Sequence, residues 1–146
     1  MQNRRLSAVY VVTALVALLL TWSQNLAYFG PSAAGPLAAF PLFLTDAAIN
    51  PAARSIAFDI LLMLYAASLW MVFEGRRRRM RFVWAYVVLG LMVAISVTFP
   101  LFLAAREMKA TAAPDIEGRP SLLDGVGIGL LTAVVGALCL FVLKQA

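Results

Sequence analysis

The sequence predicts an all-α integral membrane protein, a four-helix bundle with a short interfacial or re-entrant segment between the first two helices. Three observations support this fold class. Hydrophobic residues make up 63% of the 146 residues and the mean hydropathy is +0.89, more than the core of a small soluble domain could bury. Four segments are long and apolar enough to span a bilayer. An arginine-rich turn, RRRRMR, separates two of them.

The spans follow from length, because a helix needs about 20 mostly apolar residues to cross a bilayer. The first apolar run follows Arg4 and Arg5, as in a signal peptide, but it is too long and residues 25–27 (NLA) are a poor cleavage site. An uncleaved helix is therefore expected, within a single transmembrane domain over residues 1–146. The predicted spans are residues 6–29, 55–73, 82–103 and 122–143.

Between the first two spans lies GPLAAFPLFL, residues 35–44. This stretch is too short to span a bilayer and too apolar to lie free in water, so we expect a short helix or re-entrant turn in the interface. Its FPLFL repeats at residues 99–103, but the flanking residues of the two copies share no identity. We interpret both copies as proline-containing helix ends, where membrane helices tolerate proline best. Asn50 and Pro51 predict the next helix start.

The distribution of Lys and Arg predicts the orientation. If the N-terminus is cytoplasmic, four crossings place eight cations inside and four outside. The chain is therefore expected in the bacterial inner (cytoplasmic) membrane with both termini cytoplasmic. The inner set is Arg4, Arg5, Arg76, Arg77, Arg78, Arg79, Arg81 and Lys144, and the outer set is Arg54, Arg106, Lys109 and Arg119.

Composition also excludes several kinds of site. The chain has no histidine and one cysteine, which excludes haem ligation by histidine, His/Cys zinc sites, Cys-His catalysis and an intrachain disulfide. No metal or other cofactor is expected. Cys139 lies in an apolar run and is expected to pack. The net charge of +5 is concentrated in one turn beside an apolar helix, so it favours a membrane and not nucleic acid.

Asp59, in the second span, and Glu74, directly after it, are the candidate catalytic residues. Asp59 lies about 12 Å along a helix that starts at Pro51, where an ionised side chain facing lipid is disfavoured by up to about 3 kcal/mol. It is expected either to form a structural hydrogen bond to a neighbouring helix or to handle a ligand or a proton. Glu74 precedes four arginines and can also pair with them at the interface.

Spacing places Asp59, Met63, Ala66, Trp70 and Glu74 on one broad helix face. Two interpretations remain open for this face. It is either a groove for a long apolar molecule, which makes Met63 and Trp70 candidate ligand-binding residues, or a packing seam between helices.

Gln24, Asn25 and Arg106 complete the candidate ligand-binding residues. Gln24 and Asn25 end the first span and carry amide donors that could bond Asp59 at a similar depth; the alternative is that both are solvated. Arg106 could pair with Asp59 if the third span lies beside the second.

The last span contains a GxxxG pair, Gly125 and Gly129, which allows another helix to approach closely. That helix belongs either to this chain or to a partner, in a homo-oligomer or a larger membrane complex. Asp124, just before the pair, suits a helix N-terminus, where negative charge is favoured.

The order of several motifs resembles the DUF2834 family of small bacterial and cyanobacterial membrane proteins. The motifs are Asn50-Pro51 before a span, Asp59 early in it, Glu74 followed by arginines, and PLFL closing the next span with Arg106-Glu107. They cover residues 50–107, with weaker support over the first span. The resemblance implies an architecture but no reaction, and the fourth span is an addition to it.

Three functions fit these features. The first is a non-catalytic subunit, assembly factor or lipid-binding scaffold among membrane lipids. The second is an enzyme acting on an isoprenoid or carotenoid type of lipid or pigment, with Asp59 as proton donor and Trp70 steadying a carbocation. The third is a small proton-coupled carrier acting as an oligomer. The sequence leaves open whether the protein is an enzyme.

Overall fold

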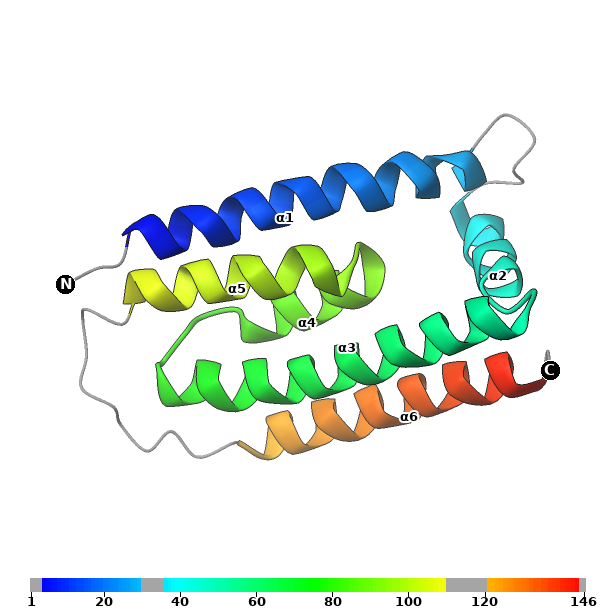
Figure 1. Cartoon of the computed structure of the whole chain (residues 1–146). Coiled ribbons are helices and arrows are strands. Elements are labelled where there is room, and N and C mark those ends of the chain that lie inside the picture. Colours follow the sequence, from blue (N-terminus) through cyan, green and yellow to red (C-terminus); the bar gives the residue numbers. More distant parts are fainter. Residues whose placement is uncertain (1–3, 30–35, 110–120, 145–146) are drawn as a thin grey trace.

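The computed structural model describes residues 4–29, 36–109 and 121–144. These residues form helices joined by short turns, without strands, which confirms the predicted all-α class but not the predicted count of four helices. The elements, labelled in Figure 1, are α1 (Arg4–Asn25), the 3-10 turn η1 (Leu26–Phe29), α2 (Pro36–Asp46), α3 (Pro51–Arg77), α4 (Val83–Met92), α5 (Ile95–Lys109) and α6 (Leu122–Lys144).

Three of these helices are long and apolar enough to cross a membrane. They cover Arg4–Phe29, Pro51–Arg77 and Leu122–Val142, with 26, 27 and 21 residues, and about 20 residues suffice for a crossing. They correspond to the first, second and fourth predicted spans. Large apolar side chains on their outer faces are exposed, for example Leu19 at 71% and Leu130 at 65%, as lipid contact requires.

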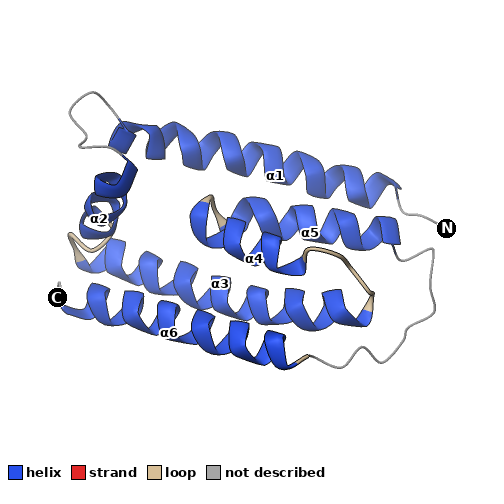
Figure 2. Cartoon of the chain, turned by 180° about the vertical axis from the view of Figure 1, so that it is seen from behind, coloured by secondary structure: helices blue, strands red, loops and turns tan. Residues whose placement is uncertain are grey.

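The third predicted span, residues 82–103, is wrong as a single helix. The structure divides it into α4 and α5, which fold back on each other as a hairpin (Figures 1 and 2). α4 has 10 residues, about 15 Å of helix, so the hairpin turns partway along α3. Both of its ends therefore lie near the same end of the bundle.

Gly90 provides the physical reason for this turn. A Cβ atom at Gly90 would lie 3.0 Å from Thr98 Oγ1 and 3.3 Å from Ile95 Cδ1. The returning helix therefore packs directly onto the backbone of α4, which a larger side chain at this position would prevent. Hydropathy alone cannot reveal the turn, because the residues on both sides of it are apolar.

Trp22 of α1 stabilises the tip of the hairpin. Its indole nitrogen donates a hydrogen bond to the carbonyl oxygen of Val93 at 3.3 Å. The next carbonyl, that of Ala94, accepts from the backbone N–H groups of Val97 and Thr98, both at 3.2 Å. Backbone groups in the apolar layer need such partners because no water is available there. Trp22 therefore stabilises the hairpin by a hydrogen bond from α1.

The segment between the first two spans is α2, which lies across one end of the bundle (Figure 1). The short helix between the first two spans is thus confirmed, while its place in the membrane interface stays a prediction. Tyr28 Oη donates to Asp46 Oδ2 at 2.9 Å and so joins η1 to the end of α2. Asn50 caps α3 as predicted, with its Oδ1 accepting from the N–H of Ala53 at 2.9 Å, and Pro51 follows at the first helical position.

α3 is the central helix. α6 lies along one side of it and the α4–α5 hairpin along the other, while α1 packs against α5 (Figures 1 and 2). The buried core draws on α3, the hairpin and α6, and α1 contributes Ala14 as its one buried residue. The core residues are Leu64, Met71, Val72, Met80, Val83, Val87, Phe102, Leu131 and Val135.

The two ends of the bundle differ in the elements that they contain. One end, here called the arginine end, holds the start of α1, the α3–α4 turn, the end of α5 and the start of α6 (Figure 1). The other, the α2 end, holds α2, the start of α3 and the end of α6. Arg4 and Lys144 therefore lie at opposite ends, which conflicts with the expectation that both termini face the cytoplasm. That expectation required four crossings.

Cysteines at positions 5 and 144 are therefore expected to react from opposite sides of the membrane. The background would carry Cys139→Ala, which removes the one native thiol. Labelling sealed vesicles with a charged maleimide, before and after permeabilisation, measures the side of each cysteine. Labelling of both positions from the same side would restore the four-span topology.

Candidate functional site

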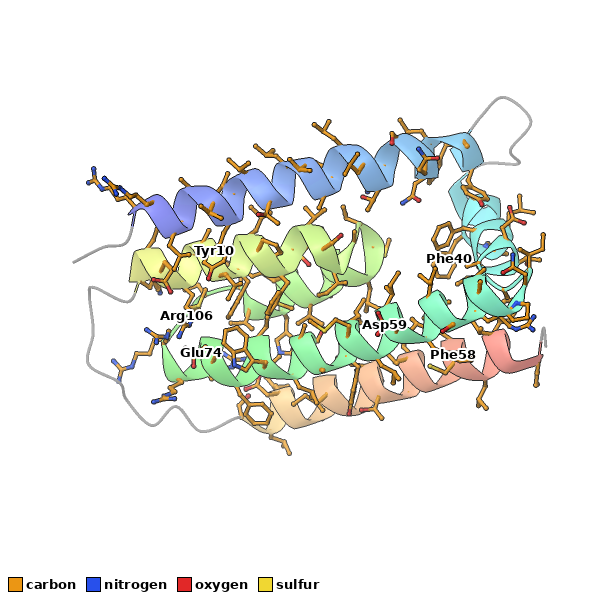
Figure 3. The ribbon with its side chains drawn as sticks, viewed as in Figure 1. Tyr10, Phe40, Phe58, Asp59, Glu74 and Arg106 are labelled. Atoms are coloured by element: carbon orange, nitrogen blue, oxygen red, sulfur yellow. The ribbon has the colours of Figure 1, made fainter. Side chains whose placement is uncertain are left out.

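Charged side chains from several helices meet at the arginine end. Glu74 and Arg76 belong to α3, Arg78 follows it, Arg106 lies on α5 and Asp124 on α6. Figure 3 shows Glu74 and Arg106 close together between α3 and α5. Both carboxylates are buried, with relative exposures of 8% for Glu74 and 0% for Asp124. Each is paired with arginine, which is how proteins accommodate buried charge.

Glu74 joins α3 to α5. Its Oε1 accepts from Nε of Arg78 at 2.5 Å and from Nε of Arg106 at 2.7 Å. Arg106 also donates through Nη1 to Oε1 of its neighbour Glu107 at 3.0 Å. The predicted pairing of Glu74 with the arginines that follow it is confirmed for Arg78, and the bond from α5 is an addition that the sequence did not predict.

The expected contact between Arg106 and Asp59 is wrong, because Arg106 bonds Glu74 and Glu107 instead. The direction of α5 explains the difference. A third span crossing the bilayer would have brought Arg106 to the level of Asp59, near the start of α3. Since α5 returns to the arginine end, Arg106 lies beside Glu74, near the end of α3.

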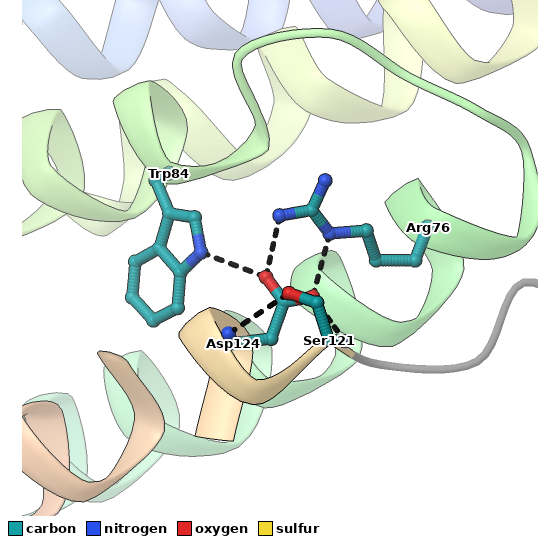
Figure 4. A network of polar contacts seen from close by, with 4 residues as sticks. All are labelled: Arg76, Trp84, Ser121 and Asp124. Atoms are coloured by element: carbon teal, nitrogen blue, oxygen red, sulfur yellow. Dashed lines mark hydrogen bonds and ion pairs between the residues drawn. The ribbon is translucent and has the colours of Figure 1, made fainter. Parts of the chain in front are cut away.

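Asp124 joins α6 to α3 and α4 (Figure 4). Arg76 binds it with two parallel bonds, Nη2 to Oδ1 at 2.6 Å and Nε to Oδ2 at 2.8 Å. The indole nitrogen of Trp84 donates to Oδ1 at 3.0 Å. The backbone N–H and the hydroxyl of Ser121 both donate to Oδ2 at 2.8 Å. Five donors therefore compensate for removing this carboxylate from water.

Ser121 and Asp124 also start α6 through reciprocal bonds. The backbone N–H of Asp124 donates to the Ser121 hydroxyl at 3.2 Å, while Asp124 accepts the N–H of Ser121. This is a capping box with aspartate in place of glutamate. The sequence shows the Ser-x-x-Asp spacing, and the prediction that Asp124 lies at a helix N-terminus is confirmed. The pairing with Arg76 and Trp84 was not predictable from it.

The glycines of α6 fall into two groups. A Cβ atom at Gly127 would lie 2.3 Å from Cζ2 of Trp84, so the indole occupies the space that this glycine leaves. Gly125, Gly129 and Gly136 have no such neighbour within 4 Å in the part of the chain that the structure describes. The predicted Gly125/Gly129 face is therefore not used for packing inside these residues.

Trp70 packs against α5. Its ring lies 5.7 Å from the rings of both Phe99 and Phe102, in edge-to-face geometry, and the Arg106 guanidinium lies 5.6 Å from its centroid. The predicted helix face that runs from Asp59 to Glu74 along α3 therefore has two parts with different surroundings. Its Trp70–Glu74 half is a seam against α5, whereas Met63, at 53% exposure, lies in the part toward the α2 end that stays exposed.

The Asp59 side chain is exposed and makes no hydrogen bond or ion pair with the described residues. Figure 3 shows it on the side of α3 that faces α1, on the α2-end side of the Glu74–Arg106 pair. The expected bonds from Gln24 and Asn25 are not formed. Gln24 is exposed and donates to Ser23 Oγ at 3.3 Å instead. The structure therefore separates Asp59 from Glu74, Trp70 and Arg106, which lie together nearer the arginine end.

In the described ranges, no three side chains of His, Cys, Asp or Glu come close enough together to hold a metal ion. Cys139 is partly buried and packs against the hydrophobic core.

Comparison with known proteins identifies a family without a known activity. The sequence model of the family described as "Protein of unknown function DUF2834" matches residues 9–108. The match extends over α1 to α5, so it includes the first span and ends before α6. No curated protein and no solved structure matches the chain.

Asp124→Asn is expected to lower the free energy of unfolding by about 1–3 kcal/mol. The change leaves the Arg76 guanidinium without its anionic partner, but Arg76 is 38% exposed, so solvent reduces the cost. Glu107→Gln is the control, with an expected loss of less than about 1 kcal/mol for a partly exposed pair. Unfolding in mixed micelles with increasing SDS measures both. An unchanged Asp124→Asn midpoint would contradict a stabilising role for this carboxylate.

Asp59→Leu and Asp59→Asn are both expected to fold with the stability of the native protein, because no described group bonds the carboxylate. Thr132→Val is the control for an interhelical hydrogen bond, since the Thr132 and Tyr65 hydroxyls lie 2.9 Å apart between α6 and α3. Its expected cost is about 0.6 kcal/mol. A larger loss in Asp59→Leu than in Thr132→Val, measured by the same SDS titration, would show that Asp59 has a protein partner.

Proposed function

Since the chain belongs to the DUF2834 family, whose activity is unknown, we propose a function from its own geometry: a non-catalytic subunit or scaffold of the bacterial cytoplasmic membrane. In this role the chain provides a rigid set of helices to which a transmembrane helix of another protein subunit binds, on the open face of α6. The observation that carries the proposal is the division of the α6 glycines into Gly127, filled by Trp84, and the open positions Gly125, Gly129 and Gly136.

The open glycines suit a helix better than they suit lipid alone. Gly125, Gly129 and Gly136 lie within about 40° of one another around α6, at 100° per residue. Such a stripe lets a second helix approach closely enough for extensive van der Waals contact, which is the main attraction between helices in lipid. Larger apolar residues near the start of the helix are also exposed, among them Leu122 at 87% and Leu123 at 77%.

The ion pairs at the arginine end support a structural role for their carboxylates. Glu74 is bonded by two arginines, and Asp124 by Arg76, Trp84 and Ser121. These bonds connect different helices, so both acids contribute to holding the bundle together. Glu74 was the second candidate catalytic residue, but its carboxylate already accepts hydrogen bonds from Arg78 and Arg106, which favours a structural role.

The distribution of charge supports an orientation with the N-terminus in the cytoplasm and the end of α6 outside. Of the 11 Lys and Arg residues in the described ranges, nine lie at the arginine end and two, Arg54 and Lys144, at the α2 end. This bias exceeds the eight-to-four ratio of the four-span topology and follows the positive-inside rule. The nine are Arg4, Arg5, Arg76, Arg77, Arg78, Arg79, Arg81, Arg106 and Lys109.

Binding of an apolar lipid or pigment is the second candidate function, and the exposed Asp59 carboxylate favours it. Asp59 lies within a membrane-capable helix, where a group with a hydrogen-bond donor would stabilise it. An isoprenoid-type enzyme that combines Asp59 with Trp70 fits less well, since Trp70 is packed against α5 and Arg106. A proton-coupled carrier would use the same carboxylate within an oligomer.

Gly125→Leu combined with Gly129→Leu tests the scaffold function. The double variant is expected to fold, because open space surrounds both positions, but to lose association with the partner helix. Native gels of membranes in mild detergent would show the 15.8 kDa chain moving from a larger assembly to the size of the single chain.

The matched control is Ala137→Leu, which introduces the same side chain at an exposed position about 100° around the helix from Gly136. It is expected to leave the assembly intact. A native protein that already migrates as a single chain, or a double variant that stays in the assembly, would contradict the proposal.

A further inference from the structure

The turn between α3 and α4 contains two residues in a backbone conformation that favours glycine. Arg79 has φ 49° and Phe82 has φ 59°, and no other described non-glycine residue has positive φ. Arg79 ends α3 in a Schellman motif, in which the N–H of Met80 bonds the Gly75 carbonyl at 2.8 Å and the N–H of Arg79 bonds the Arg76 carbonyl at 3.1 Å.

Glycine is the usual residue at the position of Arg79, because it adopts a left-handed conformation without a steric penalty. A bulky residue such as Phe82 is disfavoured there even more. Packing inside the protein does not account for either side chain, since Arg79 and Phe82 are both exposed and Phe82 reaches 76%. Strained residues that packing does not require point to a contact outside the chain.

Three cations lie together at this turn. Arg79 and Arg81 are exposed, and the Lys109 ammonium from the end of α5 donates to the Arg79 carbonyl at 2.8 Å. The described acids at this end do not balance them, because Glu74, Glu107 and Asp124 are each already paired with Arg78, Arg106 or Arg76. The surface of the turn is therefore positive, which suits an anion.

The exposed ring of Phe82 indicates which kind of anion binds at this turn. Its exposed ring lies beside Arg81, whose guanidinium is 5.8 Å from the ring centroid. An exposed aromatic ring next to cations at the end of a membrane-capable helix is typical of the interface, where the ring enters the apolar layer and the cation extends to the headgroups. A soluble polyanion would offer nothing for the ring to contact, whereas a lipid offers acyl chains.

We propose that Arg79, Arg81 and Lys109 bind the phosphate of an anionic phospholipid in the leaflet at the arginine end, with Phe82 placed among its acyl chains. Two guanidinium groups and one ammonium surround the phosphate as charge-assisted donors. The site does not depend on the proposed partner helix, because α6 contributes no residue to it. It gives the arginine turn a binding role in addition to setting the topology.

Native mass spectrometry of the purified protein in nanodiscs tests this site. Nanodiscs with equal amounts of phosphatidylglycerol and phosphatidylcholine of the same chain length are expected to yield protein with phosphatidylglycerol bound preferentially. Arg81→Gln and Lys109→Gln should each weaken that preference roughly fivefold, as expected for a cation near an anionic surface. Inorganic phosphate alone should not displace the lipid.

Arg79→Gly gives the sharpest result, because a site and a purely structural turn predict different outcomes. It removes a cation and a strained residue together, so the unfolding midpoint should rise while the lipid preference falls roughly fivefold. The control Lys144→Gln removes an exposed cation from the α2 end and should change neither. Equal binding of both lipids by the native protein, loss of preference in the control, or displacement by phosphate would overturn the proposal.

Discussion

The pairing of Asp124 with Arg76 holds the two parts of this protein together. The family match ends at residue 108, and α6 follows it. Its first turn is fastened by Arg76 of α3 and Trp84 of α4, with the indole lying over Gly127. In an apolar medium no hydrophobic effect drives helices together, so buried polar bonds and close van der Waals packing at small residues decide which helices associate. The same carboxylate also caps α6.

The α4–α5 hairpin also depends on buried polar bonds, in this case bonds to backbone carbonyl groups. A chain that turns inside the apolar layer exposes carbonyl groups that water cannot reach. Here, Trp22 bonds the Val93 carbonyl, and the first turn of α5 bonds that of Ala94. At the opposite end of the hairpin, Arg106 returns to Glu74. Each part of the hairpin is thus tied to α1 or α3, and α5 lies between these two helices (Figures 1 and 2).

Length and composition were enough to predict the all-α class, the three membrane-capable helices, the short α2 and the start of α3 at Asn50. These features depend on apolar length and local capping, which a single sequence displays. The hairpin could not be predicted, because residues 82–103 are apolar whether they form one crossing helix or two shorter ones. The information lies in contacts between distant residues, namely Gly90 with Thr98 and Trp22 with Val93. The misplacement of Arg106 followed directly from that error, and the exposure of Asp59 depends on how the helices are arranged around α3.

A hairpin that turns partway along α3 has a mechanical consequence for the surrounding bilayer. On the arginine-end side of the hairpin tip, the helices drawn side by side are α1, α3, α4, α5 and α6, whereas beyond the tip they are α1, α3 and α6 until α2 is reached (Figure 1). Its outline therefore tapers, and in a bilayer the chain would occupy more area in the leaflet at the arginine end than in the other leaflet. Such a shape relieves packing stress where the leaflet at the arginine end is stretched, so the protein would gather at membrane regions of matching curvature.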